Sequence, residues 1–495
     1  MTDANPYLVT DPLSIEPYPM TYLDPRQYRI VTVGPKGGVT RSNYQIVQYL
    51  HDIRVVYNNK TFYQFDGFIY RSLTIEDMGN LIDRAVKEAT PVNPRTNSLY
   101  DVPYLSTSAK KDLISFIAST ETSGDIEVPM EIQADLDTFY KGEDGTYDNL
   151  IPFLNGVYNI ETGQLLKFTP YIFLTTRLQV NFTEHSYENT KASAAFERLF
   201  PNKDTRNCVI RMIGYTIYAK RLSKENPCLF IIYGSGGTGK STVQEMITKI
   251  LGPKNVSHLD LSQITSKFGT CLMDGKLANF CGDASTKNHK ETLIEGGTLK
   301  LLAEGQVVSV EPKGKPGYDM LPTAKLWFLG NTQPDLGAVD SGLFRRLYIV
   351  KLGKKFSPTD TLYKDLTCKE SIQWLARASL DAYIDLLATG LDFAPSKEML
   401  VERNYYSRTN NVYAFLIDFT GEEDPAVAAQ KLDGMITKEV YAAYKNFCME
   451  NGVRNYLGSN KFYSTIRTEF NMNTKKAHVA KLDGMDTTTL IFTKG

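Results

Sequence analysis

A glycine-rich stretch at residues 234–241 carries the residue types best suited to chemistry. It reads GSGGTGKS and follows the pattern GxxxxGK[ST]. Glycines let the backbone wrap so that its N–H groups face phosphate oxygens, and a helix starting at the lysine adds positive potential. The Lys240 ammonium group should reach the β- and γ-phosphates, and the Ser241 hydroxyl group should ligate Mg²⁺. The residues predicted to contact a nucleotide are Gly234, Ser235, Gly236, Gly237, Thr238, Gly239, Lys240, Ser241 and Thr242.

The residues on both sides of this loop predict the elements that must position it. The apolar run CLFIIY at 228–233 is typical of a buried strand, and apolar residues recur at helical spacing through 241–251. A glycine-rich turn without a chemical role is the alternative, and a strand before it and a helix after it argue against that reading. Further strands are predicted near 277–281, 325–330 and 347–351. This alternation is typical of α/β architecture.

An acidic residue follows one of these strands in the stretch FCGDAST. A phosphate-loop ATPase needs a carboxylate at the end of a neighbouring strand to hold Mg²⁺, and Asp283 is the best placed. Asp260 and Asp274 are alternatives, although Asp274 precedes a glycine as turn residues often do. Asp283 as a helix or turn cap also stays open. No second acid stands beside Asp283, so the sequence leaves the residue that activates water unassigned.

Two more polar positions lie next to apolar strands. Asn331 ends the run KLWFLGN, where an amide can sense the γ-phosphate and orient water; a simple turn residue is the alternative. Arg345 and Arg346 precede the strand near 347–351, and either can be an arginine finger for a neighbouring subunit or part of a solvated rim.

A lysine-bearing turn lies between the acid and the asparagine. Valines at 307–310 favour a strand, and Lys313 and Lys315 occupy the turn that follows. Such a turn can grip the phosphates of a single strand, or it can be a solvated hairpin tip.

Length, net charge, cysteine spacing and apolar runs limit the classes of protein to which the chain can belong. The 495 residues predict two to four domains, and the net charge of -1 means that any nucleic-acid contact needs a local basic surface. The six cysteines form no CxxC pair, which argues against a zinc site and a disulfide framework. No apolar run approaches the length of a membrane span, and the first residues lack the features of a signal peptide. We therefore expect a cytoplasmic protein that does not enter membranes.

Taken in order, GSGGTGKST, KLANFCGDAST, LWFLGN and GLFRRL resemble the superfamily 3 helicases, a branch of the AAA+ ATPases found in viruses, phages and mobile elements. The poxvirus-type primase–helicase group common in phages is the most similar. NGVYNIETGQLLKFTPYIFLTT is similar to the flanking domain of that group, and ITKEVYAAYKNFCMENGV to its C-terminal domain.

The resemblance implies ATP and Mg²⁺ as cofactors, a hexameric ring and translocation from 3′ to 5′ on single-stranded DNA at replication forks. It also implies individual roles, namely Asp283 as the Walker B acid, Asn331 as sensor 1, Arg345 or Arg346 as the finger, and Lys313 and Lys315 as pore contacts to DNA. Many relatives carry two adjacent acids at the Walker B position. With one acid here, water activation falls to Glu291, Glu295, Glu304 or Asp283 acting through water. No paired-carboxylate primase signature stands in residues 1–150, so a separate primase or initiator is a candidate partner.

These observations predict a multidomain α/β fold with a central AAA+ phosphate-loop ATPase. The expected parts are an extended arm at 1–40, an α+β domain at 41–200, the ATPase at 201–355, a helical segment at 356–430 and a winged-helix-like domain at 431–495. In the last part, Lys475, Lys476, His478 and Lys481 can meet phosphate, or the part only packs. Aromatic residues at 57–70 are expected to fill a sheet core rather than to stack on bases.

The predicted function is an ATP-dependent replicative DNA helicase. An origin-binding initiator whose ATP site controls assembly is the alternative, which the missing second acid and the winged-helix-like part keep open. A metabolic phosphate-loop kinase has no need for the lysine turn, Asn331 and the arginine pair together.

Overall fold

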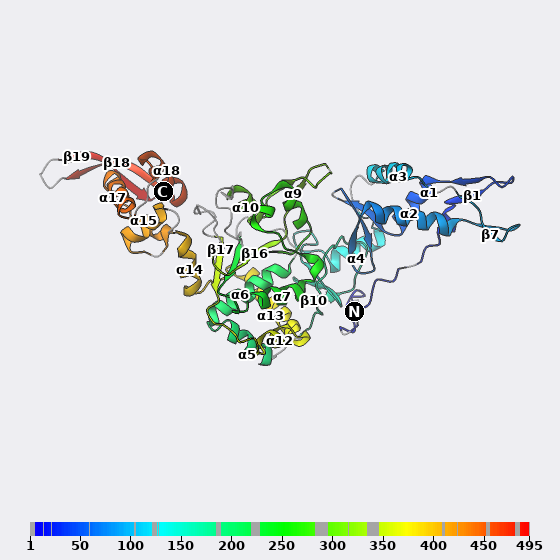
Figure 1. Ribbon diagram of the computed structural model, residues 1–495, viewed down its shortest axis with the longest axis horizontal. Helices are drawn as coiled ribbons and strands as arrows, with labels where there is room; N and C mark the ends of the chain where they lie inside the picture. Colours follow the sequence, from blue (N-terminus) through cyan, green and yellow to red (C-terminus); the bar gives the residue numbers. More distant parts are fainter. Residues whose placement is uncertain are drawn as a thin grey trace. The chain divides into compact units, whose positions relative to one another are not determined.

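The computed structural model describes most of the chain (Figure 1). The described residues are 5–12, 14–20, 22–58, 60–102, 105–120, 126, 128–184, 190–218, 228–282, 296–314, 316–333, 346–407, 411–422, 424–451, 456–480 and 486–494. The chain divides into two compact units, Met1–Glu184 and His185–Gly495. Each unit is described by itself below. Among the described residues, no helix is long and apolar enough to cross a membrane.

The first unit mixes helices with small antiparallel sheets. Its elements are η1 Pro25–Tyr28, β1 Val31–Val33, β2 Val39–Arg41, α1 Asn43–Asp52, β3 Val55–Asn58, β4 Thr61–Phe65, β5 Tyr70–Leu73, α2 Ile75–Ala89, β6 Val92–Asn93, β7 Ser98–Leu99, α3 Thr107–Thr120, α4 Met130–Phe139, β8 Leu150–Phe153, β9 Gly156–Asn159 and β10 Gln164–Leu166. Two meanders, β3-β4-β5 and β8-β9-β10, organise it.

Three aromatic side chains of the first meander are buried. Phe62, Phe65 and Tyr70 are each no more than 3% exposed. Phe65 and Tyr70 pack ring against ring, with centroids 5.3 Å apart. They fill a core, as the sequence predicts, and are not available to stack on bases.

The beginning of the chain lies along the second meander. Lys167 donates its backbone N–H to Tyr7, and Val9 donates to Leu165, at 2.7 and 3.0 Å. These bonds satisfy the outer edge of β10, which would otherwise expose unpaired backbone groups. Within the predicted arm, β1 and β2 also pair with one another.

The second unit contains the phosphate loop. Its elements are α5 Thr190–Leu199, α6 Lys203–Ile217, β11 Leu229–Tyr233, α7 Lys240–Leu251, η2 Pro253–Asn255, β12 Val256–Ser257, α8 Leu261–Ile264, α9 Lys267–Thr270, η3 Cys271–Met273, β13 Ala278–Cys281, α10 Gly296–Ala303, β14 Val308–Val310, β15 Tyr318–Met320, β16 Lys325–Gly330, β17 Leu347–Lys351, α12 Leu362–Thr367, α13 Lys369–Ala388, α14 Lys397–Ser407, α15 Asn411–Thr420, α16 Pro425–Gln430, α17 Thr437–Glu450, α18 Ser459–Phe470, β18 Met472–Ala480 and β19 Asp486–Lys494.

A parallel sheet with strand order β12-β13-β16-β11-β17 forms the centre of this unit. In the registers, Tyr233 of β11 is level with Gly330 of β16, and Cys281 of β13 is level with Phe328. Because all five strands run the same way, their carboxyl ends meet at one edge. The residues that follow β11, β13 and β16 therefore start from neighbouring places, although the sequence separates them widely.

Both faces of the parallel sheet are covered, as is usual for such sheets. On one face, the tilted rings of Phe230 and Trp327 pack with centroids 4.8 Å apart, and the Trp327 indole N–H donates to Thr216 of α6 at 3.1 Å. Strand residues alternate in direction, so their neighbours Ile231 and Phe328 join the apolar cluster on the other face. This rigid layer fixes where the strands end.

The C-terminal part consists of the helices α17 and α18 followed by the β18–β19 hairpin (Figure 1). Its core is aromatic, since Tyr444 of α17 and Phe462 of α18 stack with centroids 4.5 Å apart. An isolated bridge between Ile436 and Ile491 adds a third short pairing to the β18–β19 hairpin. Thr437 is buried within α17 and does not cap the helix, because Ile436 occupies the cap position.

Candidate nucleotide site

The glycine loop joins β11 to α7 as the sequence predicts. Gly239 has φ +96°, and a Cβ atom there would lie 2.6 Å from Leu199 Cδ1 of α5. A Cβ atom on Gly234 would lie 2.2 Å from the Leu352 carbonyl oxygen. Larger residues would therefore collide with the backbone or with α5, so both positions require glycine. The resulting cradle turns residues 237–242 toward a pocket of about 280 Å³.

Lys240 and Asn331 meet at the carboxyl edge of the sheet. The Lys240 ammonium group donates to the carbonyl oxygens of Gly234 and Ser235 at 2.5 and 3.0 Å. It also donates to the Asn331 Oδ1 atom at 3.1 Å. The lysine starts α7 and the asparagine follows β16, so two segments 91 residues apart supply one polar cluster. The sequence predicted both residues for one site, and the structure brings them together.

The predicted metal carboxylate, Asp283, lies outside the described residues. Strand β13 ends at Cys281, at the same edge as β16, so the chain leaves the sheet close to Asn331. The two alternatives are engaged elsewhere. Asp260 caps α8 by accepting from the Gln263 N–H group at 2.9 Å, and Asp274 accepts from the Tyr318 hydroxyl group at 2.7 Å. Asp283 as the metal carboxylate stays a prediction from the sequence.

Metal ligands other than Asp283 can be considered from the described part. The Ser241 side chain is exposed and lines the pocket. The described residues contain no group of three or more His, Cys, Asp or Glu side chains arranged to hold a metal ion. A magnesium ion at this site would therefore depend on Ser241, Asp283, water and phosphate oxygens, as is common for Mg²⁺.

Arg346 is buried and forms an ion pair with Glu304. Its side chain is 3% exposed, and burial lowers the pKa of its guanidinium group below the usual range. Glu304 also accepts a hydrogen bond from Gln306. This position gives no support to Arg346 as a finger for another subunit, or to Glu304 as the group that activates water. Arg345, Glu291 and Glu295 lie outside the described part of the chain.

The predicted lysine turn is a β-hairpin. Strands β14 and β15 pair with Val308 opposite Met320, and both of these side chains are buried. Lys313 is exposed at the tip, and Gly314 has φ +74°, as the turn requires. Lys315 is not among the described residues. The buried Val308 and Met320 and the exposed Lys313 fit both a contact to single-stranded DNA and a solvated hairpin tip.

A second wall of the pocket was not predicted. It consists of residues between Phe356 and Tyr363, which follow β17. The Phe356 N–H group donates to the Gly237 carbonyl oxygen at 2.9 Å, tying this segment to the glycine loop. No sequence motif indicates the contact, because it depends on β17 lying beside β11 in the sheet.

Glu402 of α14 is the other residue that the sequence did not indicate. Its carboxylate group accepts from the hydroxyl group of Tyr233 and, at 3.0 Å, from the Gln333 amide group. It also lies 3.4 Å from the Lys351 ammonium group. Tyr233 directly precedes the glycine loop, and Gln333 stands two residues after Asn331. One carboxylate thus holds the ends of three strands around the site.

Three segments of the chain match known protein families. Residues 43–204 match a family described as D5 N terminal like, and residues 407–488 match one described as Poxvirus D5 protein-like. The chain is similar to D5-type proteins. Between these segments, residues 232–346, which include the glycine loop and Asn331, match a family of unknown function designated DUF5906.

Solved structures give weaker likenesses. The apo structure of the NrS-1 C-terminal region is 11% identical, with a TM-score of 0.45, over 91% of this chain and 99% of that chain. The A form apo structure of the same region is 12% identical, with a TM-score of 0.37, over 63% and 77%. These identities and TM-scores are too low to assign a fold or a function to this chain.

Proposed function

We propose that this chain is an ATP-dependent replicative DNA helicase of a phage or mobile element, which translocates on single-stranded DNA as a ring. The contact between Lys240 and Asn331 at the end of a phosphate loop carries the proposal. D5-type family matches on both sides of that loop support a role in replication.

In this proposal, Lys240 exchanges its contacts with the loop carbonyl groups for the β- and γ-phosphates of ATP. The ammonium group already lies at the mouth of the cradle, so little reorganisation is needed. Asn331, no longer bound to Lys240, then orients the attacking water near the γ-phosphate.

Magnesium would be held by Ser241 and Asp283. The ion would supply positive charge that offsets the negative charge developing on the phosphates. Ser241 is the second residue of α7 and lines the pocket, which suits a role as a magnesium ligand. In the sequence, Asp283 stands two residues after Cys281, where β13 ends.

The AAA+ assignment and the ring belong to the same proposal. The insertion of β16 between β11 and β13 supports the assignment, because Asn331 then follows a strand that lies between the other two. Arg345 is the candidate finger of a neighbouring subunit in a hexamer. Lys313 and Lys315 would contact the single strand inside the ring, and the C-terminal part would be a winged-helix-like domain.

The proposed partners are single-stranded DNA, replication forks and a separate primase or initiator, in the cytoplasm of the host cell. Because the net charge is -1, contacts to DNA must be local and strongly dependent on salt.

The test measures ATP hydrolysis with and without single-stranded DNA, together with unwinding of a forked duplex. The proposal expects hydrolysis stimulated by the single strand and unwinding that requires ATP and Mg²⁺. Nucleotide binding without unwinding would instead favour the initiator, whose ATP site controls assembly.

A further inference from the structure

The pocket beside the glycine loop extends beyond residues 237–242, where we propose that the phosphates bind. Its phosphate side consists of residues 237–242, and its opposite wall consists of Phe356, Ser357, Pro358, Asp360, Leu362 and Tyr363. A nucleoside triphosphate has an apolar, flat end as well as a charged end. The apolar side chains of this second wall match the flat end.

Ionic contacts hold the second wall in place. Arg198 of α5 makes two hydrogen bonds to the Asp360 carboxylate group, at 2.6 and 2.7 Å, and the Leu362 N–H group donates to the same carboxylate at 2.8 Å. Helix α5 also packs Leu199 against Gly239. The same helix therefore sets the distance between the glycine loop and the second wall.

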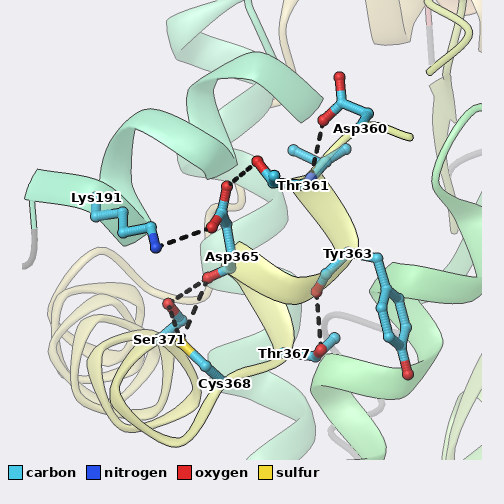
Figure 2. Close-up of polar contacts among 9 residues, drawn as sticks. Lys191, Asp360, Thr361, Tyr363, Asp365, Thr367, Cys368 and Ser371 are labelled. Atoms are coloured by element: carbon cyan, nitrogen blue, oxygen red, sulfur yellow. Dashed lines mark hydrogen bonds and ion pairs between the residues drawn. The ribbon is translucent and has the colours of Figure 1, made fainter. Parts of the chain in front are cut away.

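Helix α12 is fixed by a separate polar network (Figure 2). Lys191 lies 3.0 Å from the Asp365 carboxylate group, which also accepts from the Thr361 hydroxyl group at 2.6 Å. In Figure 2 the ring of Tyr363 points away from this network. The side chain is thus directed by a rigid helix without being used to hold it.

Tyr363 is 55% exposed although it lines a pocket. Polar groups of the same wall are already engaged, since the Ser357 hydroxyl group bonds Thr359 at 2.9 Å and Asp360 is held by Arg198. An exposed ring next to engaged polar groups favours recognition through stacking, which suits every base because every base has a π-face.

We propose that this wall is the base subsite of the nucleotide site, and that Tyr363 stacks on the base of the nucleoside triphosphate. Pro358 and Leu362 contribute apolar contacts around the base, and the pair of Arg198 and Asp360 positions the segment. The inference rests on the proposed function, because it needs the phosphates to occupy the glycine loop.

The test compares two ligands on the full-length protein by calorimetry, in the presence of Mg²⁺. One is a non-hydrolysable ATP analogue, and the other is inorganic tripolyphosphate, which lacks a base. Tyr363→Ala should weaken binding of the ATP analogue by about 5- to 150-fold and leave binding of tripolyphosphate unchanged. Tyr363→Phe should retain the affinity, because it keeps the ring.

Tyr44→Ala is the matched control, since Tyr44 is 65% exposed and belongs to the first unit. Unchanged binding of the ATP analogue by Tyr363→Ala would overturn the base subsite. Equal losses for both ligands would overturn it too, because the wall would then act on the phosphates. If the wild-type protein binds both ligands but hydrolyses no ATP, the proposed function fails while the subsite stands.

Discussion

The carboxyl edge of the parallel sheet, where the candidate nucleotide site lies, differs from the C-terminal helix–helix–hairpin part in how its polar residues are brought together. At the edge, side chains from separate segments meet, and Lys240 contacts Asn331 across the sheet. In the C-terminal part, the exposed basic residues Lys475, Lys476 and His478 stand within one strand, β18. The candidate site at the edge therefore depends on residues that the fold brings together. The basic residues of the hairpin are instead neighbours in the sequence.

The two regions also differ in what their cores do. The apolar residues of the sheet hold strand ends in register, and Glu402 adds polar ties between them. The aromatic core of the C-terminal part holds α17 and α18 together around Phe462, which is fully buried. We expect single changes at the edge to alter turnover, and single changes in the aromatic core to alter stability.

Phe462→Ala should have the largest effect and should fall on stability. Loss of a fully buried phenyl ring typically lowers the free energy of unfolding by about 3–5 kcal/mol. Circular dichroism during thermal unfolding measures this change. Met449→Ala on α17 is the control, because Met449 is 57% exposed and surface changes usually stay within about 0.5 kcal/mol. Equal losses for both variants would contradict the difference between the regions.

Lys240→Ala should lower the turnover number for ATP by about 10²- to 10³-fold, as removal of a donor to developing charge does. The thermal transition should stay near that of the wild type, since Lys240 is only half-buried. Steady-state hydrolysis assays give the turnover number. The control is Lys254→Ala, an exposed lysine of η2. Normal turnover by Lys240→Ala would show that ATP hydrolysis does not depend on the phosphate loop.

Glu402→Ala should lower turnover by about tenfold with a smaller change in KM, equivalent to about 1.4 kcal/mol. Glu402 is not among the residues that line the pocket, and we expect it to act by positioning Tyr233 and Gln333. Glu402→Gln should recover part of the activity, because an amide oxygen still accepts hydrogen bonds. Glu398→Ala, exposed on the same helix, is the control. A change in KM alone would show that Glu402 does not position the strand ends.

Lys476→Ala should have the smallest effect. Loss of one phosphate contact to single-stranded DNA should reduce the slope of log affinity against log salt by about 0.7. Fluorescence anisotropy at several salt concentrations measures this slope. Lys431→Ala is the control, because the Lys431 ammonium group already pairs with Glu422. An unchanged slope would indicate that the hairpin only packs.

Local patterns predicted much of the architecture. The expected strands near 228–233 and 325–330 are β11 and β16, and the helical spacing after the loop yields α7 with its apolar face buried. Thr437 at the start of α17 has the residue type of a helix cap, but it is buried and Ile436 occupies the cap position. A buried threonine and a capping threonine look alike in sequence. The pairing of Arg346 with Glu304 was missed as well, since no local pattern marks two residues that meet across a fold.

The sequence by itself determined the cradle, because glycine conformational freedom, the lysine and the following helix are properties of adjacent residues. Only the tertiary structure decided what surrounds that cradle. The Tyr363 wall and the Glu402 ties follow from strand order and helix packing. Those contacts join residues far apart in the chain, and their formation depends on burying the whole core rather than on any local preference.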